Sequence, residues 1–349
     1  MGKIHFESWR QTAFFHNPLK DGQLDTQEIE VRIDPLTRHQ STFNPGLEGK
    51  MSILFPETDY AYLEQRAEAT RGQCFLCEER WRTATPTYST DILPEGRLQR
   101  GEVALFPNLF PVSAFHAVVK VGDRHFRLPN EISADLLEDA FTVSIESFRQ
   151  YHRRHPSIRY FTINANFLLP AGASIIHPHL QLLGSPFPGT YQELLLEKGL
   201  AYYKNHGSCY WADLVAEEKA LGERLIAQIG DSTWFAAYAP GGANEINAVW
   251  TERSHFLEWG PEEIRQMADG LSRALCAYHD MKFSSFNFSC FSGPVDSSLQ
   301  EFRCLLRLVN RQNAMPHHRT DDYYFQKLLK NEIIIQRPEK LAAFLKGYF

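Results

Sequence analysis

The expected order of strands and helices is the same in both halves of this 349-residue chain. Each half shows two strand-like stretches, a helical pattern, and two more strand-like stretches. The first set lies at 102–106, 115–121, 131–155, 160–166 and 178–184, and the second at 233–238, 246–250, 261–278, 285–292 and 302–309. Two β-β-α-β-β units predict an internal duplication and an α+β fold, with an antiparallel sheet and packed helices in each half.

The length of the chain fits two domains. We expect them at 1–190 and 191–349, with the boundary inside the segment 186–210. The first hundred residues carry several prolines and few periodic stretches, so we expect them to be rich in loops.

The charge balance argues against large polyanionic partners. Lys and Arg total 36 and Asp and Glu total 42, a formal net charge of −6, and the basic residues form no run. Binding to nucleic acid or to a membrane surface through bulk charge is therefore not expected, and any phosphate must be held locally. The N-terminal stretch lacks the apolar segment of a secretory signal, and no window reaches the length of a membrane span. We expect a cytoplasmic protein.

The segment from Ala171 to Gln181 is the most informative stretch of the chain. On a strand, side chains two positions apart share a face, so His177, His179 and Gln181 are expected to project together. Two explanations stay open: a solvated or internally hydrogen-bonded strand face, or a reactive site. The small residues Gly172, Ala173 and Ser174 favour a site, because they let backbone N–H groups approach a phosphate.

A second motif, Cys74-Phe75-Leu76-Cys77, is compatible with half of a zinc site, a redox pair or a coincidence. The chain has no second C-x-x-C, so a tetrahedral site needs two ligands of another type, and His125 and His177 are candidates. The other cysteines are scattered among apolar residues, as is typical of reduced thiols in a core; they are Cys209, Cys276, Cys290 and Cys304.

In combination, these motifs resemble the galactose-1-phosphate uridylyltransferases of the histidine-triad superfamily. The likeness covers roughly residues 30–185 well and the second half only in outline. The matching stretches are Cys74–Cys77, His116–His125, Asn166, Gly172–Ser174 and His177–Gln181, with weaker matches at Asp34–Thr37 and Phe106–Phe110.

The resemblance implies a duplicated histidine-triad-like fold, with a catalytic first repeat that holds zinc and a degenerate second repeat. It implies a structural zinc ion on Cys74, Cys77, His125 and His177, with His179 as the nucleophile and Gln181 holding the nucleotidylated intermediate. It assigns nucleotide or phosphate contacts to Asn108, Asn166, Gly172, Ala173 and Ser174. It further implies a transferase of galactose metabolism that takes a nucleotide sugar and a sugar phosphate, and a homodimer.

The sequence departs from the family pattern at two places near the nucleotide. After the Pro-Leu-Thr segment, the family's arginines are reduced to Lys50, and Leu109 stands where an acidic residue is common. These departures keep two alternatives open: an ADP-sugar or dinucleoside-polyphosphate phosphorylase that uses inorganic phosphate as acceptor, and a non-catalytic nucleotide binder.

The second half departs further. Laying strand 302–307 over the first repeat places Arg303 at His177, Leu305 at His179 and Arg307 at Gln181. The two arginines are expected either to bind a sugar phosphate between the repeats or to be solvated strand charges. We expect the polar stretch His317-His318-Arg319 in an exposed loop.

Overall fold

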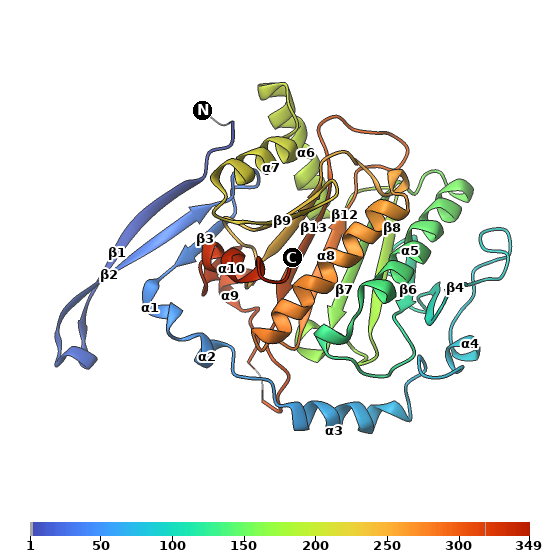
Figure 1. Cartoon of the computed structure of the whole chain (residues 1–349), viewed down its shortest axis with the longest axis horizontal. Helices are drawn as coiled ribbons and strands as arrows, with labels where there is room; N and C mark the ends of the chain where they lie inside the picture. The colour runs from blue at the N-terminus through green and yellow to red at the C-terminus, as the bar shows by residue number, and fades with distance from the viewer. Residues whose placement is uncertain (1–2, 318) are drawn as a thin grey trace.

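The computed structural model describes residues 3–317 and 319–349, and its centre is one ten-stranded sheet in which all neighbouring strands are antiparallel (Figure 1). In sheet order, the strands are β4 (Leu98–Arg100), β5 (Val103–Pro107), β6 (Phe115–Lys120), β8 (His179–Ser185), β7 (Tyr160–Phe167), β12 (Phe286–Phe291), β13 (Cys304–Asn310), β11 (Ile246–Trp250), β10 (Ser232–Ala236) and β9 (Leu225–Ile229). The α+β class with antiparallel strands and packed helices is confirmed, and the eight strands expected from the sequence are present to within two residues.

The two β-β-α-β-β units are joined edge to edge. The strand order β5-β6-β8-β7 of the first unit is repeated as β10-β11-β13-β12 in the second, and β7 pairs with β12. The sequence predicts a sheet in each half; it does not predict this junction, because pairing between strands more than a hundred residues apart leaves no local pattern.

One face of the sheet is covered by the long helices α5 (Ala134–Arg154) and α8 (Pro261–Asp280), which lie side by side (Figure 1). Their apolar stripes and the sheet form a single core, to which α5 contributes Phe141 and Phe148 and α8 contributes Met267 and Leu271. Leu180 and Leu182 of β8 point into the same core. The alternation of a strand therefore sends His179 and Gln181 to the opposite face.

On that opposite face, the second half is covered by α6 (Thr190–His206) and α7 (Tyr210–Leu221). Leu195 and Trp211 from these helices pack with Phe235 and Leu305 from the strands. The segment 186–210, expected to be an interdomain boundary, is thus mostly helical. In the first half, the same face carries a smaller cluster in which Cys74, Cys77 and Trp81 pack on Ala104 and Phe106.

The first hundred residues contain more regular structure than expected. A four-stranded sheet and several short helices are present: β1 (Glu7–Asn17), β2 (Gln23–Ile33), β3 (Gln40–Phe43) and β14 (Asn331–Ile334), with α1 (Pro45–Glu48), α2 (Met51–Leu54), α3 (Tyr60–Arg71) and α4 (Trp81–Ala84). The β1–β2 hairpin extends away from the body of the molecule (Figure 1). The expectation of loops was wrong here because β1 is largely exposed on both faces and lacks the apolar alternation of a half-buried strand.

Four 3₁₀ helices complete the secondary structure of the described residues, and they are η1 (Pro18–Lys20), η2 (Pro129–Glu131), η3 (Leu169–Ala171) and η4 (Phe256–Glu258).

The N-terminal strands pack against the C-terminal segment. Near the C-terminus lie α9 (Tyr324–Lys327) and α10 (Pro338–Leu345). Arg32 of β2 pairs with Glu339 of α10 at 2.7 Å, and β3 runs parallel to β14. His317 and Arg319 are exposed, whereas His318 lies outside the described residues. No helix in the described part of the chain is both long enough and apolar enough to cross a membrane.

Gly270 allows α8 to approach the sheet closely. A Cβ atom at this position lies 2.1 Å from Cζ2 of the fully buried Trp234. Alanine favours a helix over glycine by about 1 kcal/mol, but overpacking a core costs about 1–3 kcal/mol. We therefore expect Gly270→Ala to lower the free energy of unfolding, measured by urea denaturation. Gly49→Ala is the control, because a Cβ atom added at Gly49 would meet no atom within 4 Å. This control should change the free energy of unfolding by less than about 0.5 kcal/mol. A Gly270→Ala protein that is more stable than the wild type would contradict the packing argument.

Candidate active site and metal centre

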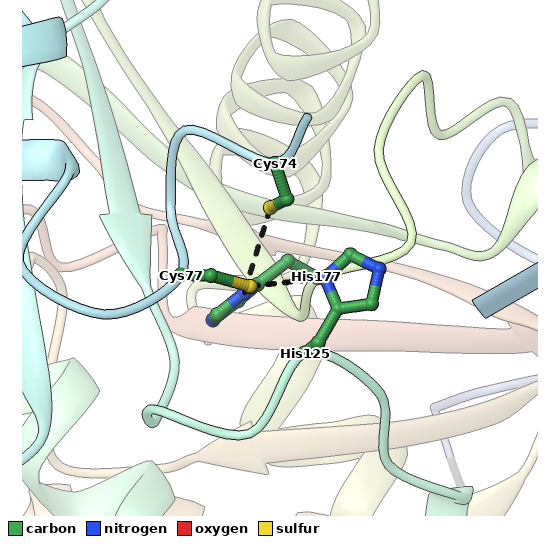
Figure 2. Close-up of side chains that lie close together, drawn as sticks. All are labelled: Cys74, Cys77, His125 and His177. Atoms are coloured by element: carbon green, nitrogen blue, oxygen red, sulfur yellow. Dashed lines mark hydrogen bonds between the residues drawn. The ribbon is translucent and has the colours of Figure 1, made fainter. Parts of the chain in front are cut away.

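Four potential metal ligands from three separate loops meet beside the first repeat. Cys74 and Cys77 lie between α3 and α4, His125 follows β6, and His177 directly precedes β8. All four are buried, and their ligand atoms lie within 4.8 Å of one another (Figure 2). The structure thus brings together the four residues that the sequence comparison assigned to a metal.

The distances within the cluster fit a tetrahedral ion. The Cys77 Sγ atom lies 3.1 Å from Nδ1 of His125 and 3.5 Å from Nδ1 of His177, and Cys74 Sγ lies 3.8 Å from Nδ1 of His177. Normal zinc–sulfur and zinc–nitrogen bonds at tetrahedral angles give an S···N separation of about 3.6 Å. The four donors therefore fit a metal ion that prefers thiolate and imidazole ligands, and they leave no open coordination position.

The second nitrogen of each histidine is held so that Nδ1 faces the cluster. Nε2 of His177 donates to the carbonyl of Gly122 at 2.8 Å. Nε2 of His125 lies 3.0 Å from Oγ1 of Thr70, a hydroxyl that itself donates to the Arg66 carbonyl. Both rings then carry their proton on Nε2 and keep the Nδ1 lone pair free, as a metal ligand requires.

The electrostatics of the cluster also favour a cation. Burial lowers the pKa of His177 to about 4, so its ring is neutral at physiological pH. Burial and the adjacent Cys74 raise the pKa of the Cys77 thiol to about 12. A thiolate is therefore unfavourable in this pocket without a positive charge, and a bound metal ion would supply that charge.

His179 is anchored by its own neighbour. Its Nδ1 atom donates to the backbone carbonyl of His177 at 2.9 Å, which is the acceptor beside Pro178 that a nucleophilic histidine needs. Nε2 consequently carries the lone pair, and it has no hydrogen-bond partner among residues 3–317 and 319–349. Burial lowers the pKa of His179, and the bond to His177 opposes this shift only in part, so the neutral ring is favoured.

Gln181 is oriented by His116, a residue to which the sequence analysis assigned no role. The Nδ1 atom of His116 accepts a hydrogen bond from the Val112 N–H at 3.1 Å, so the proton of the ring lies on Nε2. That Nε2 atom donates to Oε1 of Gln181 at 3.0 Å. Nδ2 of Asn108 lies 3.2 Å from the same Nε2 atom. The amide group of Gln181 is thereby left as a free donor. The sequence contained one signal for this role, namely a histidine inside the otherwise apolar strand FHAVVKV. The structure shows that His116 is buried there.

The second repeat supports the first. Asn287 of β12 donates to Oδ1 of Asn166 at 2.7 Å and to the carbonyl of Ala171 at 2.9 Å. Arg311 in turn donates to Oδ1 of Asn287 at 2.6 Å, and Asp321 holds the other side of this guanidinium. Neither Asn287 nor Arg311 was found from the sequence, because their role depends on the pairing of β7 with β12.

The Gly-Ala-Ser segment forms a tight turn between η3 and β8. Gly172 adopts φ +89°, and a Cβ atom there lies 3.9 Å from Nδ2 of Asn166. The N–H groups of Gly172 and Ala173 donate to the carbonyls of Leu169 and Leu168, so they are already engaged inside the turn. Ser174 is exposed and has no partner among the described residues. Its contact with a phosphate stays a prediction.

The structure rules out solvated strand charges, one of the two explanations for Arg303 and Arg307, and it also places the Asp34–Thr37 segment, Lys50 and Leu109. Arg303 and Arg307 are not solvated: Arg303 donates to backbone carbonyls, including that of Leu299 at 3.1 Å, and Arg307 forms a bidentate pair with Glu245. The Asp34–Thr37 segment lies against the second half, where Leu36 packs with Phe235. Lys50 is exposed, and Leu109 is 65% exposed.

Comparisons with known proteins place the fold. No protein-family model matches the chain. The chain is 29% identical over 330 residues to an uncharacterized protein from Archaeoglobus fulgidus, and the alignment covers 94% of each chain. It is similar to a GalT-like protein from Arabidopsis thaliana, with a TM-score of 0.69 and 18% identity over 90% of this chain and 98% of that chain.

Two enzymes have related structures. An ADP-glucose phosphorylase from Arabidopsis thaliana with bound ADP-glucose matches with a TM-score of 0.69 and 19% identity over 91% of this chain and 98% of that chain. A uridylyltransferase matches with a TM-score of 0.64 and 19% identity over 72% of this chain and 85% of that chain. These likenesses show the fold, and at that level the resemblance to the galactose-1-phosphate uridylyltransferases is confirmed.

The cluster predicts that metal and stability are lost together. We expect Cys74→Ser to reduce the bound metal, measured by elemental mass spectrometry, and to lower the free energy of unfolding by several kcal/mol, because a closed metal site contributes directly to folding. Cys276→Ser, at a half-buried cysteine outside the cluster, is the matched control and should retain the metal. A purified wild-type protein that is free of metal and as stable as after metal loading would refute the assignment.

Proposed function

We propose that this chain is a nucleotidyltransferase of the histidine-triad type that carries a nucleoside monophosphate on His179. The observation that supports this most directly is the hydrogen bond from His179 Nδ1 to the His177 carbonyl, which leaves a buried, neutral ring with a free Nε2 lone pair. The donor class is a nucleoside diphosphate sugar, and the leading acceptor is a sugar 1-phosphate. The fold shared with a uridylyltransferase and an ADP-glucose phosphorylase agrees with this class of chemistry.

The reaction proceeds in two displacements at phosphorus. The Nε2 lone pair of His179 forms a bond to the α-phosphorus, while the bond from that phosphorus to the bridging oxygen breaks and its electron pair leaves with the sugar 1-phosphate. The ring then carries a positive charge, and its proton stays on Nδ1, hydrogen-bonded to the His177 carbonyl. An oxygen of the acceptor phosphate next bonds to the phosphorus, and the P–N bond breaks to return the electron pair to Nε2.

Gln181 holds the nucleotidylated intermediate in this scheme. Because its Oε1 accepts a hydrogen bond from His116, its amide N–H groups are available for a phosphoryl oxygen. An amide has no acidic proton to give to a leaving group, so it suits transfer between two phosphates better than hydrolysis. Asn108, Asn166 and Ser174 supply the remaining contacts to the nucleotide, and the Gly172–Ala173 turn, whose N–H groups bond within the turn, positions Ser174.

We propose zinc as the ion held by Cys74, Cys77, His125 and His177, on the strength of the two-thiolate, two-imidazole donor set. When bound, zinc anchors the segment that carries His179, and it has no open position for substrate. The catalytic repeat is assigned to residues 1–190 and the degenerate repeat to 191–349, since Leu305 and Arg307 occupy the second repeat's counterparts of His179 and Gln181. A homodimer and a cytoplasmic location complete the proposal.

A second candidate changes only the acceptor. If inorganic phosphate attacks the intermediate, the protein is an ADP-sugar or dinucleoside-polyphosphate phosphorylase. Two observations favour keeping this candidate: the ADP-glucose phosphorylase has as high a TM-score as the GalT-like protein, and the exposed Leu109 supplies no polar contact for recognising uridine beside Asn108.

The mass of the covalent adduct tests the nucleophile and the base together. The protein is incubated separately with UDP-glucose and ADP-glucose, and intact-protein mass spectrometry is expected to find one added nucleoside monophosphate from the preferred donor. His179→Gly should abolish this adduct, and His5→Gly, at an exposed histidine, should not affect it. Tight nucleotide binding without an adduct would leave the non-catalytic binder as the explanation. Release of the adduct by sugar 1-phosphate or by inorganic phosphate then separates the two enzymatic candidates.

The contact between His116 and Gln181 gives a test of positioning. We expect Gln181→Ala to slow both half-reactions by about 10²-fold, as for the loss of one donor to a developing oxyanion, and His116→Phe to slow them by about tenfold. Because His116 acts through Gln181, the double variant should be no slower than Gln181→Ala alone. Single-turnover kinetics measures all three, and fully additive losses would show that His116 acts independently.

A further inference from the structure

Between the second repeat's sheet and the helices α6 and α7 that cover it lies a cavity of about 950 Å³, large enough for a ligand of the size of a nucleotide. Its floor is formed by strands β10, β11 and β13, and its walls by α6, α7 and the segments 34–40 and 326–331. In Figure 1, α6 and α7 lie over this end of the sheet. Aromatic side chains line much of the cavity, and they are Tyr191, Tyr210, Trp211 and Phe235.

Several polar groups in this cavity have no partner in the described part of the chain. Tyr210 lines the cavity, and its hydroxyl, which is not among the fully buried unpaired atoms, makes no hydrogen bond within that part of the chain. Asn247 lines the cavity from β11, and its fully buried Oδ1 atom is also unpaired. Buried polar groups normally have partners. The buried, unpaired Oδ1 atom of Asn247 departs from this rule, and together with the Tyr210 hydroxyl it points to a ligand that supplies hydrogen-bonding atoms.

Arg307 adds a positioned positive charge. Its Nε and Nη2 atoms donate to the carboxylate of Glu245 at 2.6 and 2.9 Å, and its guanidinium lies 4.7 Å from the centre of the Tyr191 ring. The two contacts hold the guanidinium in one orientation, and Nη1 has no partner among the described residues. The exposed Arg38 and Lys330 also line the cavity, as do the carboxylates of Asp34, Glu193 and Glu197. A fixed guanidinium with a free N–H is well suited to a phosphate oxygen.

The cavity is separate from the His179 site. Gln181, Asn164, Ser289 and Arg307 form a row of directly opposed residues across β8, β7, β12 and β13. Three strand spacings separate Gln181 from Arg307, which is about 14 Å. Leu305, on β13 in the cavity lining, stands at the counterpart of His179, so the second repeat has no imidazole at that position.

We propose that this cavity binds the phosphate ester of a sugar ring. The aromatic side chains contact the face of the ring, Tyr210 and Asn247 hydrogen-bond its hydroxyl groups, and Arg307 and Lys330 hold the phosphate. Hexose phosphates and nucleoside monophosphates share this chemistry. The inference does not depend on the reaction proposed for the first repeat.

Calorimetric titration of the full-length protein with glucose 1-phosphate and with AMP tests the inference and distinguishes the two sources. One of these ligands is expected to bind, whereas glucose and inorganic phosphate, each lacking half of the recognised chemistry, should bind at least tenfold more weakly. Tyr210→Phe and Asn247→Leu should each weaken binding about three- to tenfold, as for the loss of one hydrogen bond. Tyr202→Phe is the matched control, because that hydroxyl donates to Asp213 and lies outside the cavity lining.

Hydrogen exchange localises the bound ligand. Protection is expected in α6 and α7, and protection confined to residues 168–185 would place the ligand at the His179 site and overturn the inference. An affinity unaffected by either cavity variant, or no binding of either probe at millimolar concentration, would do the same. Adduct formation on His179 is measured separately, so a missing adduct contradicts the proposed reaction and a missing cavity ligand contradicts only this inference.

Discussion

The position of His179 depends on one residue, His177. The ring of His177 faces the cysteine cluster through Nδ1 and is held from behind by the Gly122 carbonyl, while its backbone carbonyl accepts the hydrogen bond from His179. Pro178 between them restricts the backbone, and its carbonyl accepts a hydrogen bond from the Val121 N–H at 2.9 Å. A metal ion bound at the cluster would therefore also fix the imidazole two residues along the chain. The candidate metal ligand and the proposed nucleophile thus belong to a single short segment.

The two repeats share one sheet but have come to differ in what their open faces hold. In the first repeat, that face carries the metal cluster and the polar groups around His179. In the second, α6 and α7 close over it and leave a cavity with aromatic walls and an arginine tied to Glu245. The repeats are also not independent, because Asn287 and Arg311 of the second hold Asn166 of the first. Loss of one repeat would remove part of the other's site.

The fold alone does not select a reaction. Proteins of this architecture include a uridylyltransferase and an ADP-glucose phosphorylase, whose names differ in both the nucleotide and the type of transfer, and a shared fold is compatible with either. What distinguishes them lies in the groups that meet the base and the acceptor. In this chain the contacts proposed for the nucleotide come from Asn108 and Ser174, and the neighbouring Leu109 is apolar and 65% exposed.

The sequence by itself determined the elements whose signals are local. Hydrophobic periodicity located the strands and long helices of both repeats. The spacing of His177, His179 and Gln181 predicted a shared strand face and a candidate site there, because side-chain direction along a strand repeats every two residues. The family resemblance assigned a metal to Cys74, Cys77, His125 and His177, and these four side chains do lie together in the structure.

Only the tertiary structure decided the features that depend on distant pairing. The β7–β12 junction, the support of Asn166 by Asn287, and the contact of His116 with Gln181 each join residues 65 or more positions apart. The exposed β1–β2 hairpin also escaped detection, because a strand with solvent on both faces needs no apolar alternation. The cavity around Arg307 could not be predicted from the sequence, for the same reason as the β7–β12 junction. Its walls come from four separate parts of the chain, and no local sequence pattern indicates that they meet.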